Sequence, residues 1–345
     1  MEAGNGALLL ELSGEALYDS NIFTNDSEQE DYIFTLSPKL SFQQESGVVH
    51  LDAAIGAEIG EFLDYSEQSY QDLSTELSLS GFHRKDSPFS FGLRTGWREE
   101  TWTSEEVGTR IEAEIFDASA MADLALSEKL GMRGALDYQD SSYENTFYQD
   151  SEDFEARLDA VHYYSDKLQL TAGYRYREIS YASTLPKQQT DSFIIGAEGQ
   201  LTEKLNGLVE IGYILQDNGN DDTLIYTVAL DWAVDEKTAL SLEGQRDTSV
   251  SLTGQNAIST SITLNARQQF TQRVSASAFA SYGEFERSGL DPRDDDFIQF
   301  GVGYMQEFNE TTFLTADLSY EERDSNSVQS NYDRILASVR LNVLF

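Results

Sequence analysis

Carboxylates and guanidinium groups recur at every second position of segments whose other positions are apolar. Between Val49 and Ala57, for example, the apolar residues alternate with His50 and Asp52, and Glu58 follows in the same register. Alternate side chains of a strand point to opposite faces, so these polar groups would share one face. Such a face holds water and ions, and the chemistry it favours is selection among dissolved polar solutes.

The charges predicted to line this inner face carry both signs, with carboxylates in the majority, so we expect a net-acidic lumen. A single charge could tune the passage of solutes, or it could simply be a solvated or paired wall residue, and the sequence leaves both interpretations open. The predicted lumen-lining residues are Glu11, Glu15, Asp52, Glu58, Glu76, Arg94, Arg98, Asp137, Arg157, Asp159, Arg175, Arg177, Glu198, Glu210, Asp231, Arg267, Asp317 and Arg340.

Catalytic and metal-binding patterns are poor. The chain has 3 histidines and no cysteine, and it contains no nucleophile elbow, zinc-protease motif or phosphate loop. His50 beside Asp52 is the only catalytic hint, near the predicted turn end of its strand. Acidic residues gather in segments 217–222 and 291–296 without EF-hand spacing, so a diffuse acidic surface is favoured over a calcium site. The sequence therefore predicts no enzyme, no cofactor and no metal site.

The elements that position these residues are predicted to be paired strands. A turn of similar composition recurs as Ser127-Glu128-Lys129, Ser165-Asp166-Lys167, Thr202-Glu203-Lys204, Asp235-Glu236-Lys237 and Thr271-Gln272-Arg273. An alternating apolar and polar segment follows each turn, which is typical of hairpins. We expect about 18 strands, with 16 as the alternative, from residues 7–18 to residues 332–345. No apolar run approaches the ~18 residues of a spanning helix.

These features predict one all-β domain over residues 1–345, a single antiparallel transmembrane β-barrel. Aromatic residues near both strand ends suggest two interfacial girdles, which disfavours a soluble solenoid or sandwich. The final residue, Phe345, is predicted to be a membrane-insertion signal. In residues 110–126 the apolar residues change parity, from Ile111, Ala113 and Ile115 to even positions, so we expect a β-bulge within residues 116–119.

Loop lengths and charge indicate orientation and location. Tight turns alternate with longer loops rich in Asp, Asn and Ser, as periplasmic turns alternate with extracellular loops. The net charge of -38, from 61 acidic and 23 basic residues, excludes a basic surface for nucleic acid. We therefore expect the outer membrane of a Gram-negative bacterium, with a signal peptide removed and outer-membrane lipid and lipopolysaccharide as partners.

The N-terminal hairpin carries Tyr18-Asp19-Ser20-Asn21-Ile22-Phe23 and the step Leu36-Ser37-Pro38. With the Glu-Lys-Leu turns and Gly173-Tyr174 further on, it resembles the putative β-barrel porin 2 family over most of the chain. The resemblance implies an outer-membrane barrel associated with export of exopolysaccharide or capsule.

Three functions therefore remain. The first is a porin serving secretion of a surface polysaccharide, with that polymer as cargo and a periplasmic export partner. In this case inward Tyr163 could stack on sugar rings, or it could merely pack against a neighbouring strand. The second is a general cation-preferring diffusion porin. The third is a closed barrel that anchors a surface or periplasmic assembly.

Overall fold

The computed structural model describes residues 2–3, 6–46, 48–81, 87–183, 185–216, 222–289, 292–327 and 330–345. These residues form strands throughout, apart from one short 3-10 helix, η1 (Ser66–Gln68). Within them, no helix is long and apolar enough to cross a membrane.

The strands are long and follow the predicted alternation. Their bounds are β1 (Glu2–Ala3), β2 (Gly6–Asp19), β3 (Asp31–Ser46), β4 (Val49–Phe62), β5 (Tyr70–Gly81), β6 (Phe89–Ser104), β7 (Thr109–Ala125), β8 (Leu130–Tyr143), β9 (Ser151–Tyr163), β10 (Leu168–Tyr181), β11 (Gln188–Gln200), β12 (Leu205–Gln216), β13 (Thr223–Ala233), β14 (Thr238–Val250), β15 (Asn256–Thr271), β16 (Val274–Arg287), β17 (Arg293–Asn309), β18 (Thr312–Ser325) and β19 (Tyr332–Leu344).

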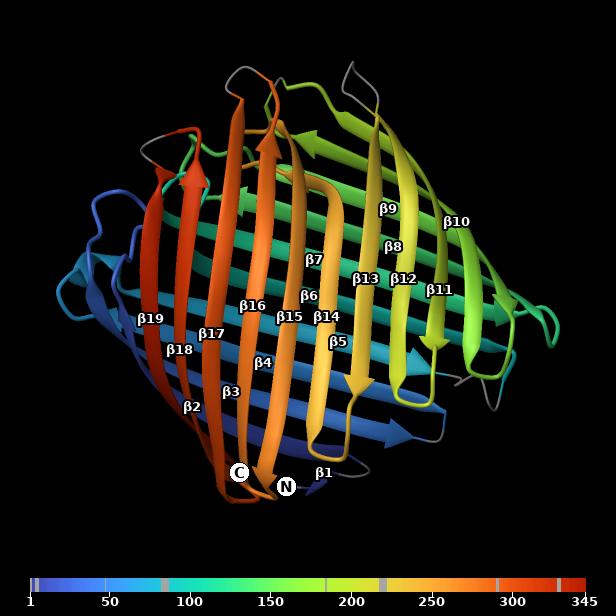
Figure 1. Ribbon diagram of the computed structural model, residues 1–345, viewed down its shortest axis with the longest axis horizontal. Coiled ribbons are helices and arrows are strands. Elements are labelled where there is room, and N and C mark those ends of the chain that lie inside the picture. Colours follow the sequence, from blue (N-terminus) through green and yellow to red (C-terminus); the bar gives the residue numbers. More distant parts are fainter. Residues whose placement is uncertain are drawn as a thin grey trace.

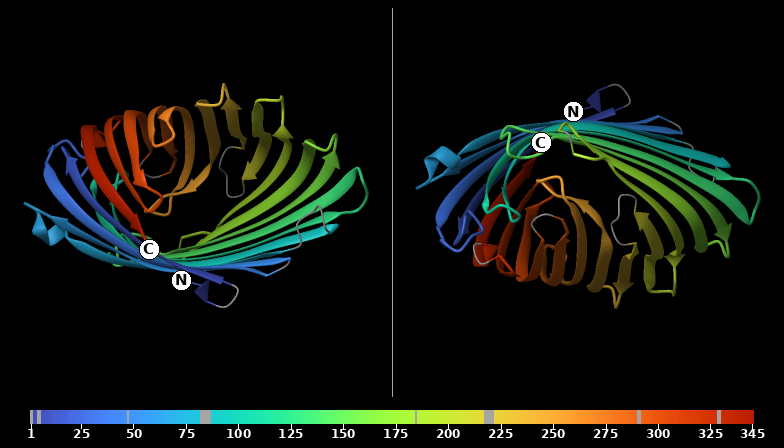
Figure 2. Two further views of the ribbon diagram at one scale, coloured as in Figure 1. Left: turned by 90° about the horizontal axis from the view of Figure 1, so that it is seen from below. Right: turned by 90° about the horizontal axis from the view of Figure 1, so that it is seen from above.

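The sheet closes on itself. From β2 to β19 each strand pairs antiparallel with the next, and β19 pairs back onto β2 with Leu336 opposite Asp19 and Leu344 opposite Glu11. The predicted barrel with 18 strands is thus confirmed; β1 adds only a two-residue pairing with β2. The closed sheet is flattened, with β2–β9 facing β13–β19, and the strands of the two walls cross at a large angle (Figures 1 and 2).

The outer face is apolar and the inner face is polar. Large apolar side chains such as Ile195, Val302 and Leu318 remain more than half exposed, at 62%, 57% and 51%. A folded chain leaves such a continuous apolar band uncovered only where lipid replaces water. Phe345 also lies on the exposed surface, and its backbone exchanges two hydrogen bonds with Leu10 of β2.

The recurring turn sequence has a physical cause. In the first turn the Ser127 hydroxyl accepts hydrogen bonds from the backbone N–H groups of Lys129 and Leu130, at 3.3 and 3.1 Å. In the fourth, Asp235 does the same, and the N–H of Lys237 together with Thr238 holds the pKa of Asp235 below its usual range. A short acceptor at the first position therefore stabilises each reversal.

The predicted bulge in β7 is absent. The pairing of β7 with β6 and with β8 runs without a register shift through residues 116–119. Ile111, Ala113 and Ile115 therefore point inward, where they are buried, at 1%, 6% and 7% exposure. The prediction was wrong because an apolar side chain can face a packed interior as well as lipid, and the alternation alone does not distinguish the two.

Candidate functional site: the lumen and its mouth

The structure places the predicted lumen-lining residues on the inner face of the barrel. Ion pairs between strands that are not neighbours identify this concave face. Arg133 of β8 reaches Glu198 of β11 at 3.0 Å, and Arg175 of β10 reaches Asp247 of β14 at 2.6 Å. Side chains of such separated strands meet only where the sheet curves around them.

The inner arginines are held by carboxylates. Arg157 binds Asp159 and Glu210, with nitrogen-to-oxygen distances of 2.9 and 2.6 Å. The remaining pairs that involve predicted residues are Arg94 with Glu76, Arg98 with Glu100 and Asp117, Arg175 with Glu155, Arg177 with Asp153, and Arg340 with Glu15.

A second group of predicted residues forms no ion pair within the described part of the chain. It comprises Glu11, Asp52, Glu58, Asp137, Asp231, Arg267 and Asp317. Two of these accept hydrogen bonds from neutral donors: Asp52 from the Ser78 hydroxyl at 3.4 Å and Glu58 from the Tyr70 hydroxyl at 2.7 Å. The group is predominantly acidic. One of its members, Asp137, lines a cavity of about 600 Å³ together with Arg94, Arg175 and Asp247 among others.

Tyr163, the inward aromatic residue considered for sugar stacking, packs against the wall. Its hydroxyl oxygen lies 2.2 Å from the position that a Cβ at Gly131 would take. The glycine of β8 thus provides the space for the tyrosine ring of β9, which favours the structural interpretation.

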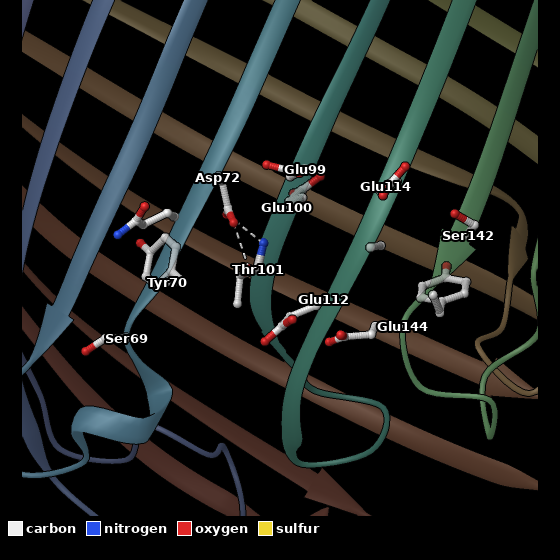
Figure 3. A pocket seen from close by; sticks show the side chains of 13 residues that line it. Ser69, Tyr70, Asp72, Glu99, Glu100, Thr101, Glu112, Glu114, Ser142 and Glu144 are labelled. Carbon is white, nitrogen blue, oxygen red and sulfur yellow. Dashed lines mark hydrogen bonds between the residues drawn. The ribbon is translucent and has the colours of Figure 1, made fainter.

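The mouth of the barrel is crossed by the end of the β6–β7 hairpin. Pairing between β5 and β6 stops at Ser74 opposite Arg98, and beyond this point β6 pairs only with β7. The freed backbone N–H of Thr101 donates to the Asp72 carboxylate at 2.7 Å (Figure 3). The backbone N–H of Leu73 donates to Glu99 at 3.1 Å. We call this unpaired part of the boundary between β5 and β6 the seam. Two carboxylates accept hydrogen bonds from backbone N–H groups along it, and these groups would otherwise lack a partner.

The hairpin end lies inside the wall formed by β4 and β5. The Arg110 guanidinium stacks on the inward rings of Phe62 and Tyr70, at 4.8 and 4.9 Å from their centroids. A pocket of about 470 Å³ lies along the seam, and Glu112 and Glu144 are side by side in it (Figure 3).

The tip of this hairpin, residues 105–108, reaches the opposite wall. Arg293 of β17 and Arg323 of β18 donate hydrogen bonds to the backbone carbonyls of Glu105 and Glu106. Both arginines also bind the buried Asp295. The tip therefore spans the lumen from one wall to the other.

The β14–β15 hairpin folds inward in the same way. β14 pairs with β13 only as far as Arg246, and its next residues contact β10: Arg177 donates to the Thr248 carbonyl at 2.9 Å. Its loop then meets the tip of the β6–β7 hairpin, because Glu106 accepts hydrogen bonds from Ser251 and Leu252. Two hairpins from different parts of the wall thus form a bridge across the mouth.

Sequence reasoning missed the residues that build this bridge, chiefly Glu106, Arg287, Arg293 and Arg323. The three arginines stand at the loop ends of consecutive strands in the inward register, so the alternation alone could have placed them in the lumen. Their contact with Glu106 joins distant parts of the chain and leaves no local signal. For the acidic segments 217–222 and 291–296, positions 217–221 and 291 lie outside the described residues.

A closed antiparallel barrel with an apolar outer band and a charged inner face defines an outer-membrane β-barrel porin. The family model described as Putative beta-barrel porin 2 matches residues 192–345, from within β11 to the end of β19. This match confirms the family resemblance predicted from the sequence, over that part of the chain, and the outer-membrane location.

Known structures share the fold. OpdK of Pseudomonas aeruginosa, crystallised with vanillate, is 9% identical with a TM-score of 0.56, over 98% of this chain and 99% of that chain. OccAB2 of Acinetobacter baumannii is 11% identical with a TM-score of 0.55, over 99% of this chain and 98% of that chain. OccK3 (OpdO) of Pseudomonas aeruginosa is 13% identical with a TM-score of 0.53, over 99% and 95%. The comparison with curated proteins finds no match.

Proposed function

We propose that the protein is a diffusion porin that prefers small, positively charged polar solutes. The observation that carries the proposal is the imbalance of free charge on the inner face. Most lumenal arginines are already neutralised by bound carboxylates. Asp52, Asp137, Asp231 and Asp317 form no ion pair among the described residues, although Arg340 attracts Asp317 at longer range. On the same face, the basic residues Arg267 and Lys39 of β3 likewise form no ion pair among the described residues.

Excess negative charge raises the local concentration of cations in a water-filled passage. It acts over roughly one Debye length, about 8 to 10 Å at physiological salt, so several carboxylates contribute together rather than one by one. The cavity of about 600 Å³ lined by Asp137 supports the proposal, because its volume would accommodate a hydrated small solute.

The test is the reversal potential of the refolded protein in a planar bilayer under a gradient of potassium chloride. The wild type should select potassium over chloride. Replacing Asp52, Asp137, Asp231 and Asp317 by asparagine in one variant should shift the reversal potential toward that of a non-selective pore. Asp26→Asn, in an exposed extracellular loop, is a single-charge control and should leave it unchanged. An anion-selective wild type, or a quadruple variant that keeps full selectivity, would refute the proposal.

Secretion of a surface polysaccharide gains no support from the comparisons, because the matching family model is described as a beta-barrel porin and the similar structures named above do not mention a polysaccharide. Lipopolysaccharide and a periplasmic partner likewise remain predictions. A correctly folded barrel that never conducts and co-purifies with a partner would instead favour the anchoring function.

A further inference from the structure

Glu106 occupies a ready-made binding site for a carboxylate at the mouth of the barrel. Three donors converge on its carboxylate: the Arg287 guanidinium at 2.9 Å, the Ser251 hydroxyl at 2.6 Å and the backbone N–H of Leu252 at 2.9 Å. The side chains of Arg287 and Glu106 are only 6% and 11% exposed. An arginine, a hydroxyl and an amide enclosed in this way form a cradle complementary to a planar carboxylate.

We infer that this cradle is a solute-carboxylate site which Glu106 fills when the mouth is latched, and that an external carboxylate opens the channel by taking its place. The inference goes beyond the proposed diffusion function, which concerns the sign of the permeating ion and not the opening of the mouth.

We call the contact of the Glu106 carboxylate with Arg287, Ser251 and Leu252 the latch, and its position explains how it can hold the mouth closed. Glu106 lies at the tip of the β6–β7 hairpin, Ser251 and Leu252 lie in the β14–β15 loop, and Arg287 ends β16. A single carboxylate therefore joins the two inward-folded hairpins to the far wall. Breaking it removes the hydrogen bonds from Ser251 and Leu252 that join the two hairpins directly.

The hairpin has the freedom to respond. Beyond Arg98, β6 has no backbone pairing with β5, so the hairpin end is attached to that side of the barrel by side chains. Among the described residues, Arg293, Arg323 and Asn25 also donate hydrogen bonds to the tip, in each case to a backbone carbonyl oxygen that carries no full charge. In the contact between Arg287 and Glu106 both partners are ionised, whereas in the bonds to the carbonyl oxygens at most the donor is charged, so we take the Glu106 carboxylate as the strongest single attachment.

A solute carboxylate has the same geometry as the group it would displace, whereas chloride cannot bind all three donors in the same plane. Because Glu106 is tethered, its effective concentration at the cradle is roughly millimolar or higher. We therefore expect a solute carboxylate to displace Glu106 at millimolar to high millimolar concentrations of that solute.

The experiment compares potassium acetate with potassium chloride at equal ionic strength, added to the extracellular side in single-channel recordings, with conductance normalised to that of the bulk solution. In the wild type, acetate should raise the open fraction. Glu106→Ala should raise the open fraction in chloride about tenfold, which corresponds to losing one hydrogen bond between charged groups, and should abolish the acetate response. Asp26→Asn removes one carboxylate from an exposed extracellular loop and should behave as the wild type does.

Equal open fractions for the wild type and Glu106→Ala, or an acetate response that persists in Glu106→Ala, would overturn the inference. The acetate titration of the wild type needs no variant, so a failure of Glu106→Ala to fold would not prevent the test; a flat titration there also overturns it. Cation selectivity is measured separately by the reversal potential, and its loss would refute the proposed function without touching the latch.

Discussion

Arg157 should contribute far more to the stability of the barrel than other lumenal arginines of similar appearance. Arg157 bridges Asp159 and Glu210, whose side chains are only 2% and 12% exposed. Arg157→Leu leaves both carboxylates without a cation in an enclosed part of the wall. Removing one partner of a buried ion pair costs ~3–5 kcal/mol, and we expect about 3 kcal/mol, the lower end, because the Arg157 side chain itself is 21% exposed.

The matched control is Arg340→Leu, which breaks the pair with Glu15. That arginine is 49% exposed, and pairs of this kind are worth ~0–1 kcal/mol. The assay is equilibrium unfolding in guanidinium chloride with lipid vesicles, followed by tryptophan fluorescence. Adding Asp159→Asn and Glu210→Gln to Arg157→Leu should recover much of the lost stability, because both stranded charges are then removed. Equal losses for the two arginine variants would refute the reasoning.

Two further predictions concern packing and the lipid face. Gly131→Ala should destabilise the barrel by ~1–3 kcal/mol, because the new Cβ overlaps the Tyr163 hydroxyl. The control is Gly14→Ala, where no atom lies within 4 Å of the new Cβ, and it should leave the stability unchanged. Equal unfolding midpoints for the two variants would contradict the prediction. Leu318→Arg should cost ~2–4 kcal/mol in lipid because its side chain faces the membrane core, whereas Ser319→Arg on the inner face should insert normally. The yield of inserted barrel is measured by heat-modifiable gel mobility. A higher yield for Leu318→Arg than for Ser319→Arg would mean that the lipid-facing and inner faces have been assigned the wrong way round.

The barrel itself was predictable because its main determinants are local. Alternation over ten or more residues fixes which face of a strand meets lipid, and a short acceptor such as Ser127 or Asp235 marks each tight turn. Pairing between consecutive strands then leaves little freedom in the topology. The same alternation grouped the charged residues on one face of the sheet, but it gave no means of telling which carboxylate would hold which arginine. The role of these residues in a pore stays a prediction.

The architecture of the mouth could not be predicted in this way. Ile111 and Ile115 look like lipid-facing residues, yet they are buried inside the barrel because the hairpin that carries them leaves the wall. The contact between Glu106 and Arg287 depends on how two hairpins bend and on how strongly the barrel is flattened. Neither the bending of the hairpins nor the flattening of the barrel produces a periodic pattern in the sequence. Both depend on how the whole sheet closes.

The seam between β5 and β6 has a mechanical consequence for the rim of the barrel. In an uninterrupted barrel the circumference is fixed, because widening any gap between strands breaks backbone hydrogen bonds along its length. Here the upper part of one gap is spanned by the carboxylates of Asp72 and Glu99, which can swing or release one at a time. The rim at the mouth can therefore expand or contract while the opposite part of this gap, where β5 and β6 remain paired from Ser74 to Gly81, keeps a constant width.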